Sequence, residues 1–154
     1  LDSQNSLSVS LGGVLDNQGG ALVSEGSLTA RAARLDNRGG TFSSAGALAL
    51  TSQAALDNQG GRLLSDAGVT LKGASLDNSQ SGLIAANGGI AIEARQVDNR
   101  AGEISSTSKV AVNAREQLDN RGGKVIGDSG LRLTVQRLLN QAKGVLAGRD
   151  GLSL

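Results

Sequence analysis

The side chains best suited to chemistry in this sequence belong to a recurring Asp-Asn pair. When the seven copies of the pair are aligned, Asp is present in six of them and Asn in all seven. The residues are Asp16, Asn17, Asp36, Asn37, Asp57, Asn58, Asp77, Asn78, Asp98, Asn99, Asp119, Asn120 and Asn140. Stacked carboxylates are the oxygen ligands that Ca²⁺ prefers, and Gly/Asp-rich β-roll repeats bind Ca²⁺ with them. Those repeats have a period of about nine residues, which this chain lacks. We therefore favour a structural role, in which each pair forms an Asx-type turn or the Asn side chains form a ladder.

The last copy separates the two members of the pair. Leu139 replaces Asp there while Asn140 remains, which indicates that the Asn position tolerates substitution less than the Asp position.

Glycine-rich strings such as Asn37-Arg38-Gly39-Gly40 follow most copies and are superficially similar to phosphate-binding loops. A phosphate-binding loop needs a helix N-terminus behind it, and we expect no helix here. Arg38, Arg100 and Arg121 share one corner position, which Gln or Ser occupies in the other copies. That alternation predicts a solvated edge and not a nucleic-acid track.

The residue types that are missing exclude several further chemistries. The 154 residues include no His, Cys, Pro, Met, Trp or Tyr, and Phe42 is the only aromatic residue. Without His or Cys we expect no catalytic nucleophile, metal site, cofactor site or disulfide, and we predict that the protein is not an enzyme. A net charge of +1 favours no polyanion. No apolar run is long enough to span a bilayer.

The elements that position the Asp-Asn pairs follow from the repeat itself. The copies of Leu-Asp-Asn stand 20 or 21 residues apart, and between them apolar residues alternate with a period of two. Period two predicts strands with one buried face, and a single repeat of this length cannot bury its apolar face alone. We therefore predict an all-β, right-handed parallel β-helix of about seven to eight coils, with 20–21 residues in each coil.

Three aliphatic columns are predicted to fill the interior of this solenoid. The first column contains Phe42, Leu63, Ile84, Ile104 and Val125. The second contains Leu48, Val69, Ile90, Val110 and Leu131, and the third contains Leu50, Leu71, Ile92, Val112 and Leu133. Such columns fill the narrow interior of the solenoid, here called the bore, without large aromatic rings. This explains why aromatic residues are scarce in the sequence. Proline is absent because nearly every strand amide must donate to an adjacent coil.

The irregularities of the repeat predict where the chain tolerates insertions and how it ends. The segments Leu76–Ile84 and Leu138–Leu146 are each one residue longer than their counterparts, and we place the extra residue at the corner after Asn. Leu1 aligns with Leu22, so the first coil starts partway round, and no capping element is visible. Together with the absence of Met, this predicts that residues 1–154 are a single segment of a longer β-helical array.

Repeats of the form LDNxGGxLxSxGxLxLxA resemble those of filamentous haemagglutinin and related exoproteins of Gram-negative two-partner secretion. These relatives include adhesins and contact-dependent growth inhibition effectors. The resemblance covers essentially the whole chain and rests on strings such as Leu35-Asp36-Asn37-Arg38-Gly39-Gly40. It implies a shaft that an outer-membrane transporter exports and that is secreted or displayed at the bacterial surface.

The function expected from these observations is structural: a rigid shaft segment that presents distal binding or toxin domains. One alternative is that a face of the rod itself binds a cell-surface receptor or glycan, which predicts binding by the isolated chain. A remote alternative is a β-helical enzyme that acts on polysaccharides. Such enzymes usually have long loop insertions, whereas coil length varies here by only one residue.

Overall fold

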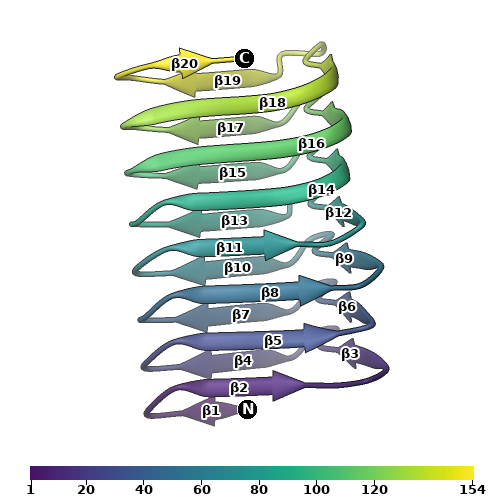
Figure 1. Cartoon of the computed structure of the whole chain (residues 1–154), viewed down its shortest axis with the longest axis vertical. Coiled ribbons are helices and arrows are strands. Elements are labelled where there is room, and N and C mark those ends of the chain that lie inside the picture. The colour runs from purple at the N-terminus through teal and green to yellow at the C-terminus, as the bar shows by residue number, and fades with distance from the viewer.

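The computed structural model describes residues 1–154 and contains twenty strands and no helix. The chain winds through about seven coils of about 21 residues, and equivalent strands of successive coils pair in parallel (Figure 1). In Figure 1 the front strands run to the right and the rear strands run to the left as the chain rises, which makes the solenoid right-handed. The predicted fold is therefore confirmed.

One strand of each coil contributes to an eight-stranded sheet, here called the first sheet. Its strands, in spatial order, are β1 (Asp2–Ser3), β4 (Ala21–Ser24), β7 (Thr41–Ser44), β10 (Arg62–Ser65), β13 (Leu83–Ala86), β15 (Glu103–Ser106), β17 (Lys124–Gly127) and β19 (Val145–Gly148).

The remaining strands form a twelve-stranded sheet, here called the second sheet, which bends around the opposite side of the solenoid. Its strands in the first four coils are β2 (Leu7–Ser10), β3 (Val14–Asp16), β5 (Leu28–Ala32), β6 (Arg34–Asp36), β8 (Leu48–Ser52), β9 (Ala55–Asp57), β11 (Val69–Lys72) and β12 (Ser75–Asp77). The later ones are β14 (Ile90–Asp98), β16 (Lys109–Asp119), β18 (Gly130–Leu139) and β20 (Leu152–Ser153).

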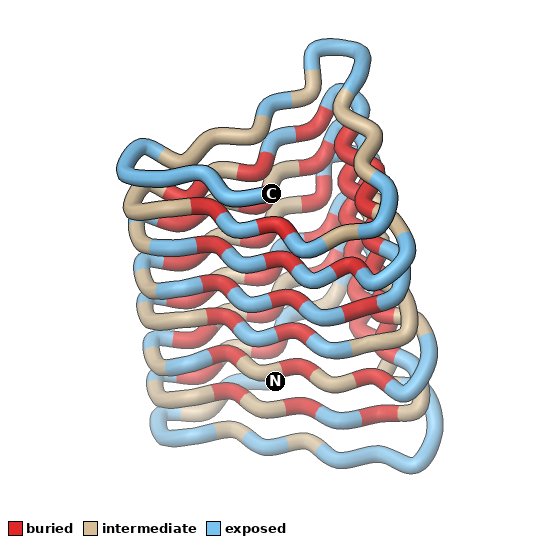
Figure 2. The backbone as a smooth tube through the Cα atoms, turned by 45° about the horizontal axis from the view of Figure 1, so that its top comes forward, coloured by how far each residue is buried: buried red, intermediate tan, exposed pale blue.

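Alternating side chains point into the bore, which Figure 2 shows along the longer strands of the middle coils as buried positions that alternate with more exposed ones. The register places Phe42 beside Leu63, Leu48 beside Val69 and Leu50 beside Leu71, and the same alignment continues through later coils. All fifteen residues of the three sequence-derived columns are at most 3% exposed. Each fully buried aliphatic side chain contributes about 1.5–3 kcal/mol of transfer free energy, so these columns supply most of the core.

A fourth column lies inside the solenoid beside these three. Its members are the first residues of the Leu-Asp-Asn copies: Leu35, Leu56, Leu76, Val97 and Leu118, each at most 3% exposed. These residues recur every 20 or 21 positions in the sequence. They were not assigned to a core column because each precedes the polar Asp-Asn pair and lies outside the segment in which apolar residues alternate. The structure shows that the third side of each coil is also apolar inside.

The corners absorb all variation in coil length, and there are two such corners. At Ser79–Gly82 the extra residue gives both Gln80 and Ser81 a positive φ, and Ala142 and Lys143 repeat this conformation. The corner between the two strands of the second sheet also varies: Ala94 to Val97 spans three steps, whereas Ala114 to Leu118 spans four.

In the last three complete coils the second of these corners is bridged by one continuous strand. β14, β16 and β18 run round it with a register irregularity at Ala94/Gln96 and at Ala114/Gln117. A bulge allows a strand to bend without ending, so these three strands continue round the corner.

Candidate functional site

The asparagines of the Asp-Asn corner form one continuous hydrogen-bonded ladder inside the solenoid. Asn37 Nδ2 donates to Asn58 Oδ1 at 2.8 Å, and Asn58 Nδ2 donates to Asn78 Oδ1 at 2.7 Å. The same contact joins Asn17 to Asn37 and continues through Asn99 and Asn120 to Asn140, at 2.7–2.8 Å throughout. Each rung therefore connects two coils through side chains that are 20 or 21 residues apart.

Each ladder amide also holds the corner of the next coil. Asn58 Nδ2 donates to the carbonyl of Leu83 at 3.2 Å, and Asn78 Nδ2 donates to the carbonyl of Glu103 at 3.0 Å. Asn37, Asn58, Asn78, Asn99 and Asn120 are completely buried. No buried side-chain nitrogen or oxygen in the chain lacks a partner. A buried amide is costly unless it is hydrogen-bonded, so the ladder makes this polar interior compatible with folding.

The aspartates of the same corner close the turn instead of pointing into the bore. Asp36 Oδ1 accepts a hydrogen bond from the backbone N–H of Arg38 at 3.1 Å, which is the Asx turn anticipated for this motif. The equivalent bond recurs at Asp16, Asp57, Asp77, Asp98 and Asp119. Leu139 cannot accept such a bond, yet Asn140 still joins the ladder.

The arginines at the next position neutralise the stacked carboxylates. Arg38 donates to Asp36 through both Nε and Nη2, at 3.0 and 2.7 Å, and its Nε also lies 3.8 Å from Asp57 Oδ2 in the adjacent coil. Arg100 bridges Asp98 and Asp119 in the same way. Their guanidinium groups are about half exposed, so the predicted solvated edge is also an edge of ion pairs.

These hydrogen bonds shift the protonation equilibria of the corner. The hydrogen bond from the Arg38 side chain lowers the pKa of Asp36, and the bond from Arg121 lowers the pKa of Asp119. The same hydrogen bonds raise the pKa of Arg38 and Arg121, and the hydrogen bond to Asp98 raises the pKa of Arg100. The carboxylates at Asp36 and Asp119 are thus favoured in their charged form.

Glycine is required where the corner meets the ladder of the previous coil. A Cβ on Gly61 would collide with the backbone oxygen of Asn37 and would come within 2.5 Å of Asn58 Oδ1. Gly39 has a φ of 62°, which favours glycine, although Ala101 adopts a φ of 55° at the equivalent position. The Gly-Gly strings therefore serve close packing and turn geometry.

The serines of the corner that follows the first sheet form a second polar row, which was not predicted from the sequence. Ser24, Ser44, Ser65 and Ser106 are buried at equivalent positions. Ser65 Oγ accepts from the backbone N–H of Ala67 at 3.0 Å and donates to the carbonyl of Gly46 at 2.8 Å. The signal in the sequence that could have identified them is their recurrence in phase with the 20–21-residue repeat, interrupted once by Ala86.

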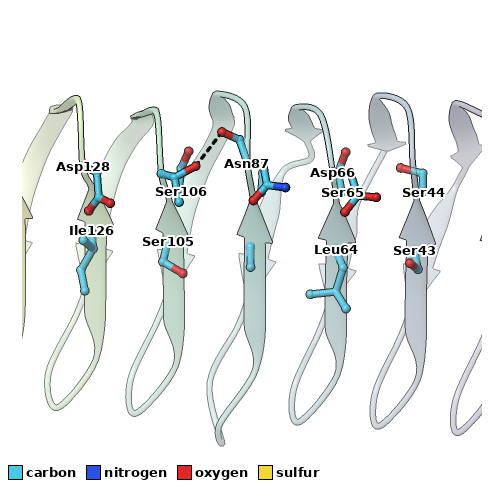
Figure 3. Close-up of a pocket in the computed structure, with 13 residues that line it drawn as sticks. Ser43, Ser44, Leu64, Ser65, Asp66, Asn87, Ser105, Ser106, Ile126 and Asp128 are labelled. Carbon is cyan, nitrogen blue, oxygen red and sulfur yellow. Dashed lines mark hydrogen bonds between the residues drawn. The ribbon is translucent and has the colours of Figure 1, made fainter.

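The outer surfaces offer shallow grooves and no cluster of acidic side chains suited to a metal ion. A groove of about 460 Å³ lies over the first sheet, lined by residues that include Ser43, Leu64, Asp66, Ser105 and Asp128 (Figure 3). It crosses five coils from β7 to β17. The structure has no helix long and apolar enough to cross a membrane.

Comparison with known families adds a match over nearly the whole chain. The family model described as haemagglutinin repeat matches residues 2–60, 60–122 and 118–154. No curated protein and no solved structure matches the chain. The boundaries of the first two matches, at residues 60 and 122, fall within Asn-x-Gly-Gly corners. The family match and the solenoid of stacked 20–21-residue coils agree, and the chain belongs to the haemagglutinin repeat family.

Proposed function

We propose that this chain is a shaft segment of a secreted or surface-displayed filamentous exoprotein and serves as a rigid extension that presents distal binding or toxin domains. The observation that supports this most directly is the uninterrupted Asn ladder, which connects seven successive coils from Asn17 to Asn140. The haemagglutinin repeat family is structural and adhesive and is not known as enzymatic.

The mechanical argument follows from how neighbouring coils are joined. Each coil is bound to the next by parallel strand pairing in both sheets, by an Asn rung and by four interior columns. Bending the rod would have to break several of these contacts at the same time on its convex side, so the rod resists bending. Because adjacent strands lie about 4.8 Å apart, each coil of 20–21 residues adds about 4.8 Å of reach. The number of coils then sets the distance at which a distal domain is held.

The family also supports proposals about export and location. A shaft of this family would leave the cell through an outer-membrane transporter of two-partner secretion and would remain secreted or at the outer cell surface. In a longer parent protein, residues 1–154 would form a single β-helical segment of a continuous array.

A second candidate is adhesion by the rod face, with the groove over the first sheet as its site. Hydroxyl, amide and carboxylate groups line that groove and are suited to hydrogen-bonding a glycan. No aromatic ring lines the groove, however, so a glycan bound there would not stack on an aromatic side chain. A glycan array probed with the wild-type chain and with the Asp66→Ala variant tests this candidate. Binding in the groove predicts that the wild-type chain gives a signal and that the variant loses it.

Rigidity can be tested by spin labels on the outer face of the second sheet. Thr29 and Arg132 occupy the same column, five coil steps apart, so labels at Thr29→Cys and Arg132→Cys stand about 24 Å apart at the backbone. The chain has no native Cys, so labelling is confined to these sites. A shaft predicts one narrow distance distribution. A broad or bimodal distribution in the folded chain would contradict the proposed function.

A further inference from the structure

The outer face of the first sheet has an arrangement of charges that is complementary to itself. β13 is the middle one of the seven strands from β4 to β19, and Leu83 is its outward-facing, half-buried residue. Arg62 in β10 and Glu103 in β15 flank Leu83 in direct register, one on each side. Neither Arg62 nor Glu103 forms an ion pair within the chain. Leu83 separates the two, and Glu103 lies in register with Lys124 on its other side and accepts a hydrogen bond from Ser105 Oγ at 3.1 Å. Both charges are therefore available to a partner.

We propose that this face binds a second copy of the same chain, with the two rods side by side and antiparallel. The symmetry axis lies in the plane between the faces, parallel to the strands, and passes over Leu83. This rotation exchanges β10 with β15, so Arg62 of each copy faces Glu103 of the other. Two ion pairs then flank a central contact between the two Leu83 side chains.

The remaining positions of the face are compatible with this arrangement. The strand register opposes Ala21 with Val145, Val23 with Ala147, Thr41 with Lys124, Ser43 with Ile126 and Leu64 with Ser105, while Ala85 meets its own counterpart. At the adjoining corner, Glu25 follows β4 and Arg149 follows β19, so these two opposite charges also face each other. No two directly opposed residues carry like charges, and Lys124 of one copy lies one strand away from Arg62 of the other.

The charge distribution along residues 1–154 also favours the antiparallel orientation. Residues 1–82 contain five Lys and Arg against seven Asp and Glu, which gives a net side-chain charge of −2. Residues 84–154 contain ten Lys and Arg against seven Asp and Glu, which gives +3. An antiparallel pair places the acidic half of one rod beside the basic half of the other. A parallel pair would place like halves together.

The size of the face predicts a weak and reversible complex. Seven strands spaced about 4.8 Å apart, each four residues long at about 3.3 Å per residue, cover about 400 Å² per copy. A stable complex usually buries about 1,200 Å² or more in total, counting both partners. We therefore expect dimers only at high protein concentration, and we expect added salt to dissociate them.

Reversing one charge at a time gives a direct test by analytical ultracentrifugation. The wild-type chain should approach the dimer mass at about 1 mM protein in low salt, a concentration range suited to weak complexes. Arg62→Glu and Glu103→Arg should each weaken self-association by about tenfold, because each creates two repulsive contacts. An equimolar mixture of the two variants should associate at least as well as the wild type, because each copy then supplies the charge that the other lacks.

Matched controls lie on the outer face of the second sheet. Lys72→Glu and Glu93→Arg change the net charge by the same amounts at neighbouring positions of β11 and β14. Each control variant should self-associate like the wild type, and circular dichroism should show the same strand content for all four variants.

Three results would overturn the proposal. They are a wild-type chain that stays monomeric at about 1 mM in low salt, single variants at Arg62 or Glu103 that associate like the wild type, and control variants that lose association as the Arg62 and Glu103 variants do.

Discussion

Asn58 Nδ2 lies 2.7 Å from Asn78 Oδ1, although 20 residues of chain separate the two side chains. Both residues are completely buried, and each also receives or donates a bond on its other side, so neither can be removed without affecting two neighbouring coils. The ladder is thus a side-chain counterpart of the backbone pairing between strands. It extends along the rod axis, which is the direction in which a shaft must resist deformation.

Replacing Asn58 by Ala should lower the free energy of unfolding by about 2–4 kcal/mol, because it deprives Asn37 of an acceptor and Asn78 of a donor in a buried site. Urea unfolding followed by far-ultraviolet circular dichroism measures this change. Asn87→Ala is the control, since Asn87 is exposed and its side chain makes no hydrogen bond within the chain; it should change stability by less than about 0.5 kcal/mol. Equal losses for the two variants would contradict the role of the ladder.

The interior columns and the charged corner should differ greatly in their sensitivity to substitution. Leu50→Asp places an unpaired charge where the side chain is only 1% exposed, and we expect a loss of about 4 kcal/mol or more, or failure to fold. Arg38→Ser should hardly change stability, because surface ion pairs contribute little. Ser79 shows that serine suits this position, since its hydroxyl donates to Asp77 at 2.6 Å. Thermal unfolding of both variants checks the contrast, and similar losses would refute it.

A methyl group on Gly61 should disrupt the contact between two coils. Because that Cβ would overlap the backbone oxygen of Asn37, Gly61→Ala requires a backbone shift and should cost about 2 kcal/mol or more. Gly12→Ala is the matched control, because no atom lies within 4 Å of its Cβ position. The difference in urea midpoint between the two variants measures the effect. Tolerance of Gly61→Ala would mean that the corner is less tightly packed than the structure indicates.

Acid should weaken the solenoid through Asp36 and Asp119. Their pKa values are lower in the folded chain than in the unfolded chain, so their contribution to stability is present above the unfolded pKa of about 3.9. This contribution is lost as the pH falls through the lower folded pKa of each group. We therefore expect the unfolding midpoint to drop below about pH 4.

Unfolding measured between pH 7 and pH 2 tests this dependence. Asp36→Asn with Asp119→Asn keeps the Oδ1 acceptor of each turn but removes the charge, so the double variant should lose less stability on acidification. An unchanged acid slope would show that other groups cause the effect.

Much of this structure could be predicted from the sequence because the controlling interactions repeat. Period-two alternation within a 20–21-residue repeat allowed only stacked parallel strands to bury the apolar positions, and corners were the only places for insertions. The match between Leu48, Val69 and Ile90 follows directly from that alignment.

Only the tertiary structure decided the direction of the polar side chains and the composition of each outer face. At the corners, alternation breaks down: Asp36 and Asn37 are adjacent and both are buried, one by its turn and one inside the ladder. Which side chain enters the bore depends on the neighbour one coil away and not on the neighbour in sequence. The same is true of Arg38, which pairs with Asp57 as well as Asp36, and of Leu83, which lies between Arg62 and Glu103. The sequence by itself therefore determined the repeat and its core, whereas the axial stacking of coils determined the ladder, the ion pairs and the outer surfaces.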